Sequence, residues 1–170
     1  RRDADADLPG QSADLGSLIA DAVNLVRPQR TSQGVEIKVE IEPEIGLVYG
    51  APHRWTQVVL NLLLNALDAL DGRGTVRIVA RLSPEGDCVL SVSDDGPGIA
   101  PEMLDRLFEP FTTTKPPGKG TGLGLAVCHA LVDGLGGRIR GSNRPEGGAL
   151  FEVRMKTLAQ RISVLPKAIV

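Results

Sequence analysis

The 170-residue sequence predicts an α/β domain built on a mixed, mostly antiparallel sheet with helices on one face. Predicted strands outnumber predicted helices, and several neighbouring strands are joined by short turns, as in hairpins. Strands and helices do not alternate along the chain, which argues against a doubly wound parallel fold. The net charge of −2 argues against nucleic-acid binding, and the hydrophobic content of 42% is ordinary for a globular protein.

The first third of the chain predicts one helix and two strands. Asp14 precedes apolar positions at helical spacing, so we expect a helix that Asp14 caps and that stops at Pro28. Strict alternation over residues 35–41 predicts a strand with one buried face, and residues 46–49 predict a short second strand.

The middle of the chain predicts a long helix and a hairpin. The helix runs over about residues 52–70, with a proline in its first turn. A turn then leads into two strands, 75–82 and 88–93, which form the hairpin. A proline begins a further short helix at residues 101–107.

The last third begins with a glycine-rich stretch, residues 107–125, which leads into a helix from Gly122 to about Gly134. Two strands, 138–142 and 150–155, close the domain. No run of about eighteen apolar residues is present, so we expect no membrane contact by this domain. Cys88 and Cys128 fit no metal or redox motif and are expected to be buried thiols in a reducing compartment.

Three patches of this sequence are unusual for a plain core. In the first, Asn61, Asn65 and Asp68 share one face of the long helix because they are three and four residues apart. Asn disfavours helix interiors, so these amides either satisfy a neighbouring loop or supply oxygens to a hard cation such as Mg²⁺. The second patch is Asp94 to Ile99, which reads either as a tight turn or as a carboxylate at a sheet end that accepts a hydrogen bond from an exocyclic amine.

The third patch is the glycine-rich stretch, where glycines feed directly into the start of a helix. Backbone N–H groups and the helix dipole make such a place suitable for a phosphate, although a flexible linker has the same composition. The spacing matches neither the P-loop nor the dinucleotide-binding motif.

Taken together, the patches resemble the ATP-binding catalytic domain of sensor histidine kinases, in the wider family shared with DNA gyrase B, Hsp90 and MutL. Residues 61–69 (NLLLNALDA) resemble the N box, and residues 94–99 (DDGPGI) resemble the first glycine box. Residues 108–111 (FEPF) resemble the F box, and residues 120–125 (GTGLGL) the second glycine box. The Thr-Thr-Lys that follows the F box is most similar to the nitrogen-regulation and C4-dicarboxylate sensor branch.

The resemblance implies the two-layer Bergerat fold: a sheet of about five strands, three main helices on one face and a mobile ATP lid from Phe108 to about Gly120. It also implies a division of the chain. We expect residues 1–13 to be a linker from a missing dimerisation and phosphoacceptor domain, 14–156 to be the catalytic domain, and 157–170 to be a C-terminal tail.

The resemblance further implies ATP and Mg²⁺ as cofactors. Asn65 is expected to ligate the metal, Asn61 to assist at the phosphates, and Asp94 to bind the adenine amino group. Lys115 and Lys119 either reach the phosphates or are solvated lid charges, and Lys115 joins the two asparagines in the expected catalytic set. The expected ATP-binding residues are Asn61, Asn65, Asp68, Asp94, Gly96, Gly98, Ile99, Phe111, Thr113, Lys115, Lys119, Gly120, Thr121, Gly122, Leu123, Gly124 and Leu125.

Asn61 stands where the ATP-hydrolysing relatives carry a glutamate that activates water. An amide cannot act as that base, so we expect slow hydrolysis and transfer of the γ-phosphoryl group to a histidine. His53 and His129 lack the acidic residue that follows the family's phosphoacceptor histidine, so the acceptor is expected on the dimerisation domain of the same parent protein.

The implied partners are that dimerisation domain and the receiver domain of a response regulator. We expect a cytoplasmic, monomeric domain, whether or not the parent protein is anchored in the inner membrane. Two alternatives remain: a non-catalytic module of the same fold that senses ATP or ADP, and a Ser/Thr kinase of the anti-sigma type, which the F box and lid sequence disfavour.

Overall fold

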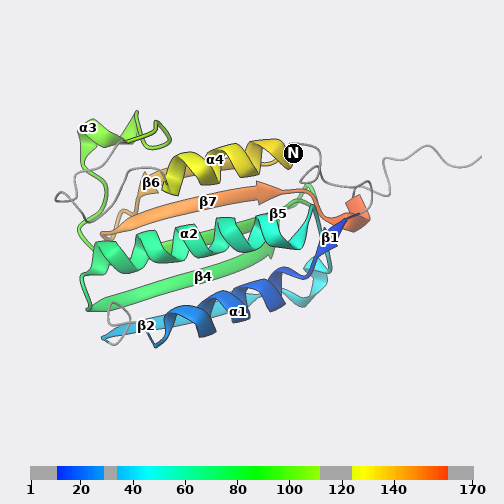
Figure 1. Cartoon of the computed structure of the whole chain (residues 1–170), viewed down its shortest axis with the longest axis horizontal. Coiled ribbons are helices and arrows are strands. Elements are labelled where there is room, and N and C mark those ends of the chain that lie inside the picture. Colours follow the sequence, from blue (N-terminus) through cyan, green and yellow to red (C-terminus); the bar gives the residue numbers. More distant parts are fainter. Residues whose placement is uncertain (1–10, 29–33, 112–123, 161–170) are drawn as a thin grey trace, which may run out of the picture.

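The computed structural model describes residues 11–28, 34–111 and 124–160. In this part of the chain, a five-stranded sheet with the order β2-β4-β5-β7-β6 is covered on one face by α1, α2 and α4 (Figure 1). The strands are β2 (Val35–Ile41), β4 (Gly74–Leu82), β5 (Cys88–Asp94), β6 (Arg138–Asn143) and β7 (Ala149–Met155). The helices are α1 (Leu15–Val26), α2 (Pro52–Leu70), the short α3 (Pro101–Leu104) and α4 (Gly124–Gly134). The predicted mixed α/β fold with helices on one face is confirmed.

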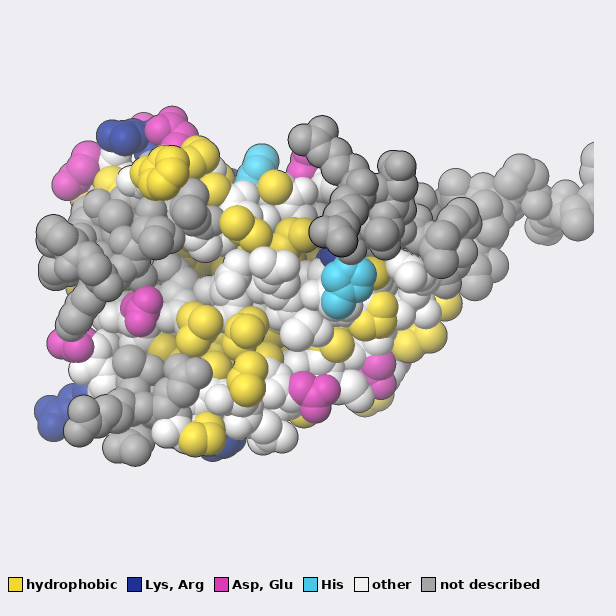
Figure 2. All heavy atoms as spheres, viewed as in Figure 1, with side chains coloured by type: hydrophobic (Ala, Val, Ile, Leu, Met, Phe, Trp, Pro, Cys, Tyr) yellow, Lys and Arg dark blue, Asp and Glu magenta, His cyan; other side chains and the backbone are white. Residues whose placement is uncertain are grey.

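The sheet is antiparallel except at one edge, where β2 pairs in parallel with β4. Because strand side chains alternate between the two faces, Ile78, Leu90 and Val153 lie under the helices and are fully buried. Arg77, Glu152 and other polar residues point to the opposite face. On the helix face, most of the Lys and Arg side chains in view lie near the edge, and hydrophobic side chains are visible over the middle (Figure 2).

The predicted helix boundaries agree with the structure where local chemistry sets them. Asp14 caps α1, and its Oδ1 accepts a hydrogen bond from the backbone N–H of Ser17 at 3.3 Å. Pro52 occupies the first turn of α2, and Asp71 ends this helix in the left-handed conformation. The short helix at Pro101 ends earlier than expected, at Leu104.

The predicted buried face of the strand over residues 35–41 is only half covered. Val35, Ile37 and Ile41 are partly buried, while Val39 is 41% exposed. The reason is position: β2 is an edge strand, so only one neighbouring strand and the end of the helix layer shield it.

The folded domain extends beyond the boundaries expected from the sequence. Residues at its start form β1 (Ser12–Ala13), which pairs with β3 (Val48–Tyr49). At its end, Thr157 is buried and forms a β-bridge with Val48, and the next N–H, of Leu158, donates to the carbonyl of Leu47 at 2.8 Å. The assignment of Thr157 to Gln160 to a tail is therefore wrong, because these residues are hydrogen-bonded to the domain.

The two cysteines are free and fully buried, as expected. Burial raises the pKa of each thiol to about 12, so neither is an available thiolate at neutral pH. Within the described ranges, no helix is both long and apolar enough to cross a membrane.

Candidate functional site

The candidate site is built on one face of α2. The opposite face of this helix is buried against the sheet, through residues such as Val59, Leu63 and Ala66. Asn61 and Asn65 are half-buried and Asp68 is exposed, so the predicted polar face is present and accessible. Successive members of this face are about one turn, or roughly 5–6 Å, apart along the helix.

The first residue of α4 lies beside Asn61. The Asn61 Nδ2 donates a hydrogen bond to the carbonyl oxygen of Gly124 at 3.4 Å. One turn further along α4, the Cys128 thiol donates to the carbonyl of Val58 at 3.7 Å. The N-terminus of α4, with its partial positive charge, is therefore held against the Asn61 end of the polar face.

Asp94 is the last residue of β5 and is 2% exposed. Its Oδ1 accepts hydrogen bonds from the backbone N–H groups of Gly96 at 2.9 Å and Ala149 at 3.4 Å. Burial nevertheless raises the pKa of Asp94 above its ordinary value. No residue in the described ranges donates to Oδ2, so this oxygen is the acceptor that Asp94 can offer to a ligand.

The glycine loop that follows Asp94 lies against the far end of α2. A Cβ on Gly96 would be 3.0 Å from Asp94 Oδ1 and 3.1 Å from the carbonyl oxygen of Ala69. Only glycine fits this approach without displacement. Since Asn61 contacts α4 and Ala69 contacts this loop, Asn65 lies midway along a stretch of roughly 12 Å.

The loop from Asp94 to Ile99 is fastened by residues that the sequence analysis missed. Asn143, at the end of β6, accepts a hydrogen bond from the Ile99 N–H at 2.6 Å and donates to the Ile99 carbonyl at 2.9 Å. Arg144 donates to the Asp94 carbonyl at 2.9 Å. The sequence does show an asparagine, Asn143, directly before a turn at a strand end. It does not show that this asparagine binds Ile99, which is 44 residues away in sequence.

Two further contacts define this loop. Gly98 has a φ of +83°, and a Cβ there would be 2.8 Å from Asn143 Oδ1. Asp95 is exposed, and its Oδ1 accepts a hydrogen bond from the Thr75 N–H at 2.8 Å. The loop is thus hydrogen-bonded to β4 through Asp95 and to β6 through Ile99. These two strands flank the central pair, β5 and β7.

The two phenylalanines of the F box have different surroundings. The ring of Phe108 is partly buried and stacks on His129 of α4, with centroids 5.2 Å apart and an interplanar angle of 30°. Phe111 is 73% exposed and has a φ of +63°, and no described contact joins it to the other site residues. His129 itself is exposed on α4, and its ring packs on Phe108 from the solvent side of that helix.

The described residues bring together most of the predicted set from three separate segments: Asn61, Asn65 and Asp68 of α2; Asp94, Gly96, Gly98 and Ile99 of the glycine loop; and Gly124 and Leu125 of α4. Phe111 is described but is not joined to these segments. The other predicted residues lie outside the described ranges; they are Thr113, Lys115, Lys119, Gly120, Thr121, Gly122 and Leu123.

The donor set on α2 suits a hard cation that keeps most of its ligands from elsewhere. Asn61 and Asn65 supply neutral amide oxygens, and Mg²⁺ is commonly held by one or two protein oxygens together with waters and phosphate oxygens. Among the described residues, no group of three or more His, Cys, Asp or Glu side chains is placed to hold a metal ion.

This combination of fold and site defines a class. The chain belongs to the histidine kinase-, DNA gyrase B- and HSP90-like ATPase family, whose family model matches residues 50–159. It is 34% identical over 156 residues to the sensor histidine kinase ZraS of Salmonella typhimurium, covering 92% of this chain and 33% of that protein. It is 34% identical over 160 residues to the C4-dicarboxylate transport sensor protein DctB of Pseudomonas aeruginosa, covering 92% and 26%. The chain thus spans a third or less of these two relatives.

Solved structures agree with this assignment. The catalytic domain of the histidine kinase ThkA has a TM-score of 0.76 and 30% identity, covering 86% of this chain and 95% of that one. Full-length ShkA in complex with AMPPNP has a TM-score of 0.74 and 28% identity, covering 89% and 32%. ThkA in complex with the response regulator TrrA has a TM-score of 0.73 and 27% identity, covering 86% and 41%. The predicted family and fold are confirmed.

Proposed function

We propose that this chain binds ATP with Mg²⁺ and transfers the γ-phosphoryl group to a histidine on a separate dimerisation domain, for relay to a response regulator. The observation that carries the proposal is the convergence on one α2 face of Asn65, the Asp94 loop and the start of α4. In the proposed arrangement, Asp94 offers a hydrogen-bond acceptor to adenine at one end of this face. Asn61 and the start of α4 lie near the phosphates at the other end.

Asp94 is the proposed adenine contact. Its Oδ1 is occupied by two backbone N–H groups, which fix the carboxyl plane. Oδ2 then accepts a hydrogen bond from the exocyclic amine of adenine, which donates and does not accept there. Gly96 and Gly98 are proposed to line the adenine site. Their missing side chains let the loop lie close to α2 and to Asn143, because a Cβ at either position would meet Asp94, Ala69 or Asn143.

The Asn65 and Asn61 amides are proposed to hold the metal and the phosphates. Asn65 supplies an oxygen to Mg²⁺, which neutralises charge on the phosphate groups when it is bound. The N-terminus of α4, at Gly124, favours the same negative charge through its dipole. Lys115 and Lys119 are proposed as additional cations for the β- or γ-phosphate.

Transfer to a histidine, and not rapid hydrolysis, follows from the residue at position 61. An asparagine has no basic oxygen near neutral pH and does not activate water, so the γ-phosphoryl group is retained for an acceptor. The chain's contribution is to position the nucleotide and balance its charge.

The proposed partners and location rest on the relatives. ZraS and DctB are named as sensor proteins, and ThkA has been solved with a response regulator. By analogy, we place this domain in the cytoplasm beside a dimerisation domain that carries the acceptor histidine. The receiver domain of a response regulator then takes the phosphoryl group.

Phosphotransfer to the parent protein's dimerisation domain tests the proposal. The parent chain is incubated with Mg²⁺ and ATP labelled on the γ-phosphate, and acid-labile label on histidine is measured. Asn65→Ala should lower the labelling rate at least about a hundredfold, as expected for loss of a metal ligand. Asn24→Ala, an exposed asparagine of α1, is the matched control and should label normally. Binding of ATP without any labelling of the unmodified protein would contradict kinase activity and favour a nucleotide-sensing module.

A further inference from the structure

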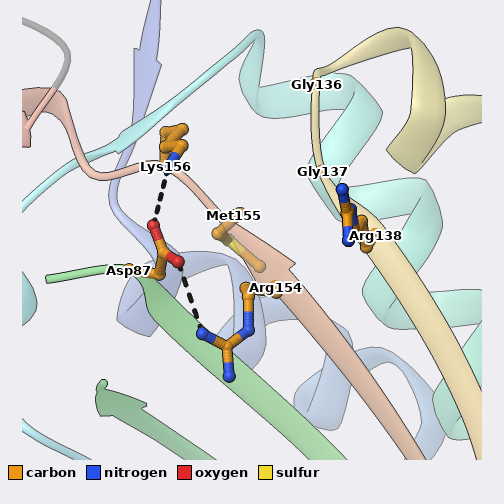
Figure 3. A pocket seen from close by; sticks show the side chains of 7 residues that line it. All are labelled: Asp87, Gly136, Gly137, Arg138, Arg154, Met155 and Lys156. Carbon is orange, nitrogen blue, oxygen red and sulfur yellow. Dashed lines mark hydrogen bonds and ion pairs between the residues drawn. The ribbon is translucent and has the colours of Figure 1, made fainter. Parts of the chain in front are cut away.

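A second candidate binding site lies at the opposite end of the sheet. A surface pocket of about 330 Å³ is lined by Asp87, Gly136, Gly137, Arg138, Arg154, Met155 and Lys156 (Figure 3). Asp87 immediately precedes β5 and Asp94 ends it, so the pocket is roughly 20 Å from the adenine contact along the strand. None of the lining residues belongs to the candidate ATP site.

The pocket places two arginines side by side. Arg138 of β6 and Arg154 of β7 are directly paired in the antiparallel ladder. Directly opposite residues point to the same face of a sheet, and like charges in that arrangement are destabilising. The neighbouring pair on the same face, Arg140 and Glu152, is complementary in charge. The arginine pair therefore lowers the stability of the sheet locally, and cross-strand pairing alone gives no reason for it.

Asp87 fixes two of the cations. Its Oδ1 accepts from Lys156 Nζ at 2.9 Å, and its Oδ2 lies 3.4 Å from an Arg154 guanidinium nitrogen (Figure 3). Gln160 donates to the same Oδ1 at 2.9 Å. The hydrogen bond from Lys156 is the main reason that the pKa of Asp87 lies below its ordinary value, so this carboxylate is ionised and the two cations are held in place.

Arg138 is not explained by this network. Lys156 and Arg154 both pair with the Asp87 carboxylate. Arg154 also lies 3.6 Å from the Glu85 carboxylate, a more distant partner. Within the described ranges, no carboxylate pairs with Arg138. Three cations against Asp87 and Glu85 leave one uncompensated positive charge, although the whole chain has a net charge of −2.

The wall formed by the turn after α4 has no side chains to fill the space. Gly136 has a φ of +78°, which favours glycine, and a Cβ on Gly137 would be 2.6 Å from the Arg154 carbonyl oxygen. The part of the pocket wall next to Arg138 is therefore bare backbone (Figure 3).

We propose that this pocket binds an oxyanion of the phosphate or carboxylate class, with the Arg138 guanidinium as its main ligand and Arg154 and Lys156 as supporting cations. Arginine matches such oxyanions because its planar donors meet two oxygens at once. The proposal is independent of ATP binding, since it involves neither α2 nor the Asp94 loop.

Titration of the ¹⁵N-labelled chain with inorganic phosphate, at constant ionic strength maintained with chloride, tests the proposal. The amide signals of Gly136 and Gly137 and the Nε–H signals of Arg138 and Arg154 should shift along a saturable curve. In Arg138→Gln the affinity should fall about tenfold, since one charge-assisted contact is lost. Arg138 is the residue to change because its replacement leaves Asp87 with both of its cations.

Arg140→Gln is the matched control, because it removes an arginine from the same strand and face outside the pocket. It should bind phosphate like the unmodified chain, and both variants should bind Mg-ATP with unchanged affinity. A parallel titration with acetate distinguishes a phosphate ligand from a carboxylate ligand. A site for carboxylates should bind acetate with an affinity similar to that for phosphate, whereas a site for phosphates should bind acetate more weakly. Shifts that do not saturate with either anion, or that are equal in Arg138→Gln and the unmodified chain, would overturn the proposal.

Discussion

At the scale of single residues, the Asp94 carboxylate lowers stability at neutral pH and is the group proposed to bind adenine. Its carboxyl is buried and its folded-state pKa is raised above 3.8, mainly because burial disfavours the charge. Ionisation therefore destabilises the fold at neutral pH. This cost disappears as the pH falls through the raised folded pKa toward 3.8.

Asp94→Asn should therefore raise the free energy of unfolding at pH 7 while weakening ATP binding. The amide oxygen still accepts from Gly96 and Ala149, which turns the NH₂ group toward the position of Oδ2. In that position the NH₂ group faces the adenine amino group, and no hydrogen bond forms because both groups are donors. Urea unfolding at pH 7 and near pH 3 checks the first part: the gain should be present at pH 7 and absent near pH 3. A variant less stable than the unmodified chain at pH 7 would contradict this account.

Asp87 should behave in the opposite way. Its folded-state pKa is lowered, mainly by the hydrogen bond from Lys156, so its stabilisation is complete above 3.8 and is lost as the pH falls through the folded value. Asp87→Asn should lower the free energy of unfolding at pH 7 by about 1.5–3 kcal/mol, the range for hydrogen bonds to charged groups. The exposed Asp133→Asn serves as the comparison and should change stability by less than about 0.5 kcal/mol. Equal effects of the two substitutions would argue against the Asp87 network.

At the scale of elements, the turn between β6 and β7 packs closely against Asp94 at the end of β5. Gly147 and Gly148 both have positive φ, at +107° and +93°. A Cβ on Gly147 meets nothing within 4 Å, whereas a Cβ on Gly148 would collide with the Asp94 carbonyl oxygen. A substitution at Gly147 therefore adds backbone strain alone, whereas one at Gly148 adds both backbone strain and a steric clash.

Gly147→Ala should cost about 1–3 kcal/mol, because only the backbone conformation is strained. Gly148→Ala should cost more than about 4 kcal/mol, since the turn or the end of β5 must also move. Chemical denaturation of both variants gives the comparison directly. Similar losses for the two would mean that the turn and β5 are not in close contact.

The Asn143 side chain should matter more for binding than for folding. Asn143→Ala removes both hydrogen bonds to Ile99, which are solvent-exposed and worth about 1 kcal/mol to stability. The loop carrying Gly96 and Gly98 is then less well positioned, so the Kd for Mg-ATP should rise several-fold. Ser142→Ala, the exposed neighbour in β6, should leave the Kd unchanged. Calorimetry on the two variants decides, and equal affinities would rule out a positioning role for Asn143.

Sequence patterns predict the local parts of this site well. Residues at three- and four-residue spacing place Asn61, Asn65 and Asp68 on one helix face, because that spacing is a property of the helix itself. The match of Asp94 to a glycine box likewise needs only neighbouring residues. The contacts of Asn143 and Arg144 depend on strand order, which puts β7 beside β5 and β6 beside β7. This order brings Asn143 to Ile99 across 44 positions and Arg144 to Asp94 across 50. No local period contains that information.

At the scale of the whole molecule, the same limitation explains the misplaced boundaries. Thr157 to Gln160 have no periodic pattern, yet Thr157 is buried against Val48 and Gln160 contacts Asp87. A chain that ends at Lys156 should be less stable than one that ends at Gln160 by about 2–4 kcal/mol, for the loss of several hydrogen bonds. Thermal unfolding of the two chains measures the difference. Equal stability would restore the boundary after Lys156.

The domain as a whole is organised so that helices and loop meet over one end of the sheet, with the proposed oxyanion pocket at the other. The measurement that tests the central claim most directly is calorimetric titration of the chain with Mg-ATP, in the unmodified form and as Asn65→Ala and Asp94→Asn. One saturable site should be seen in the unmodified chain, with affinity lowered at least about tenfold in each variant, as expected when a buried polar contact is lost. Unchanged affinity in both variants, with their folds intact, would contradict a nucleotide site between α2 and the Asp94 loop.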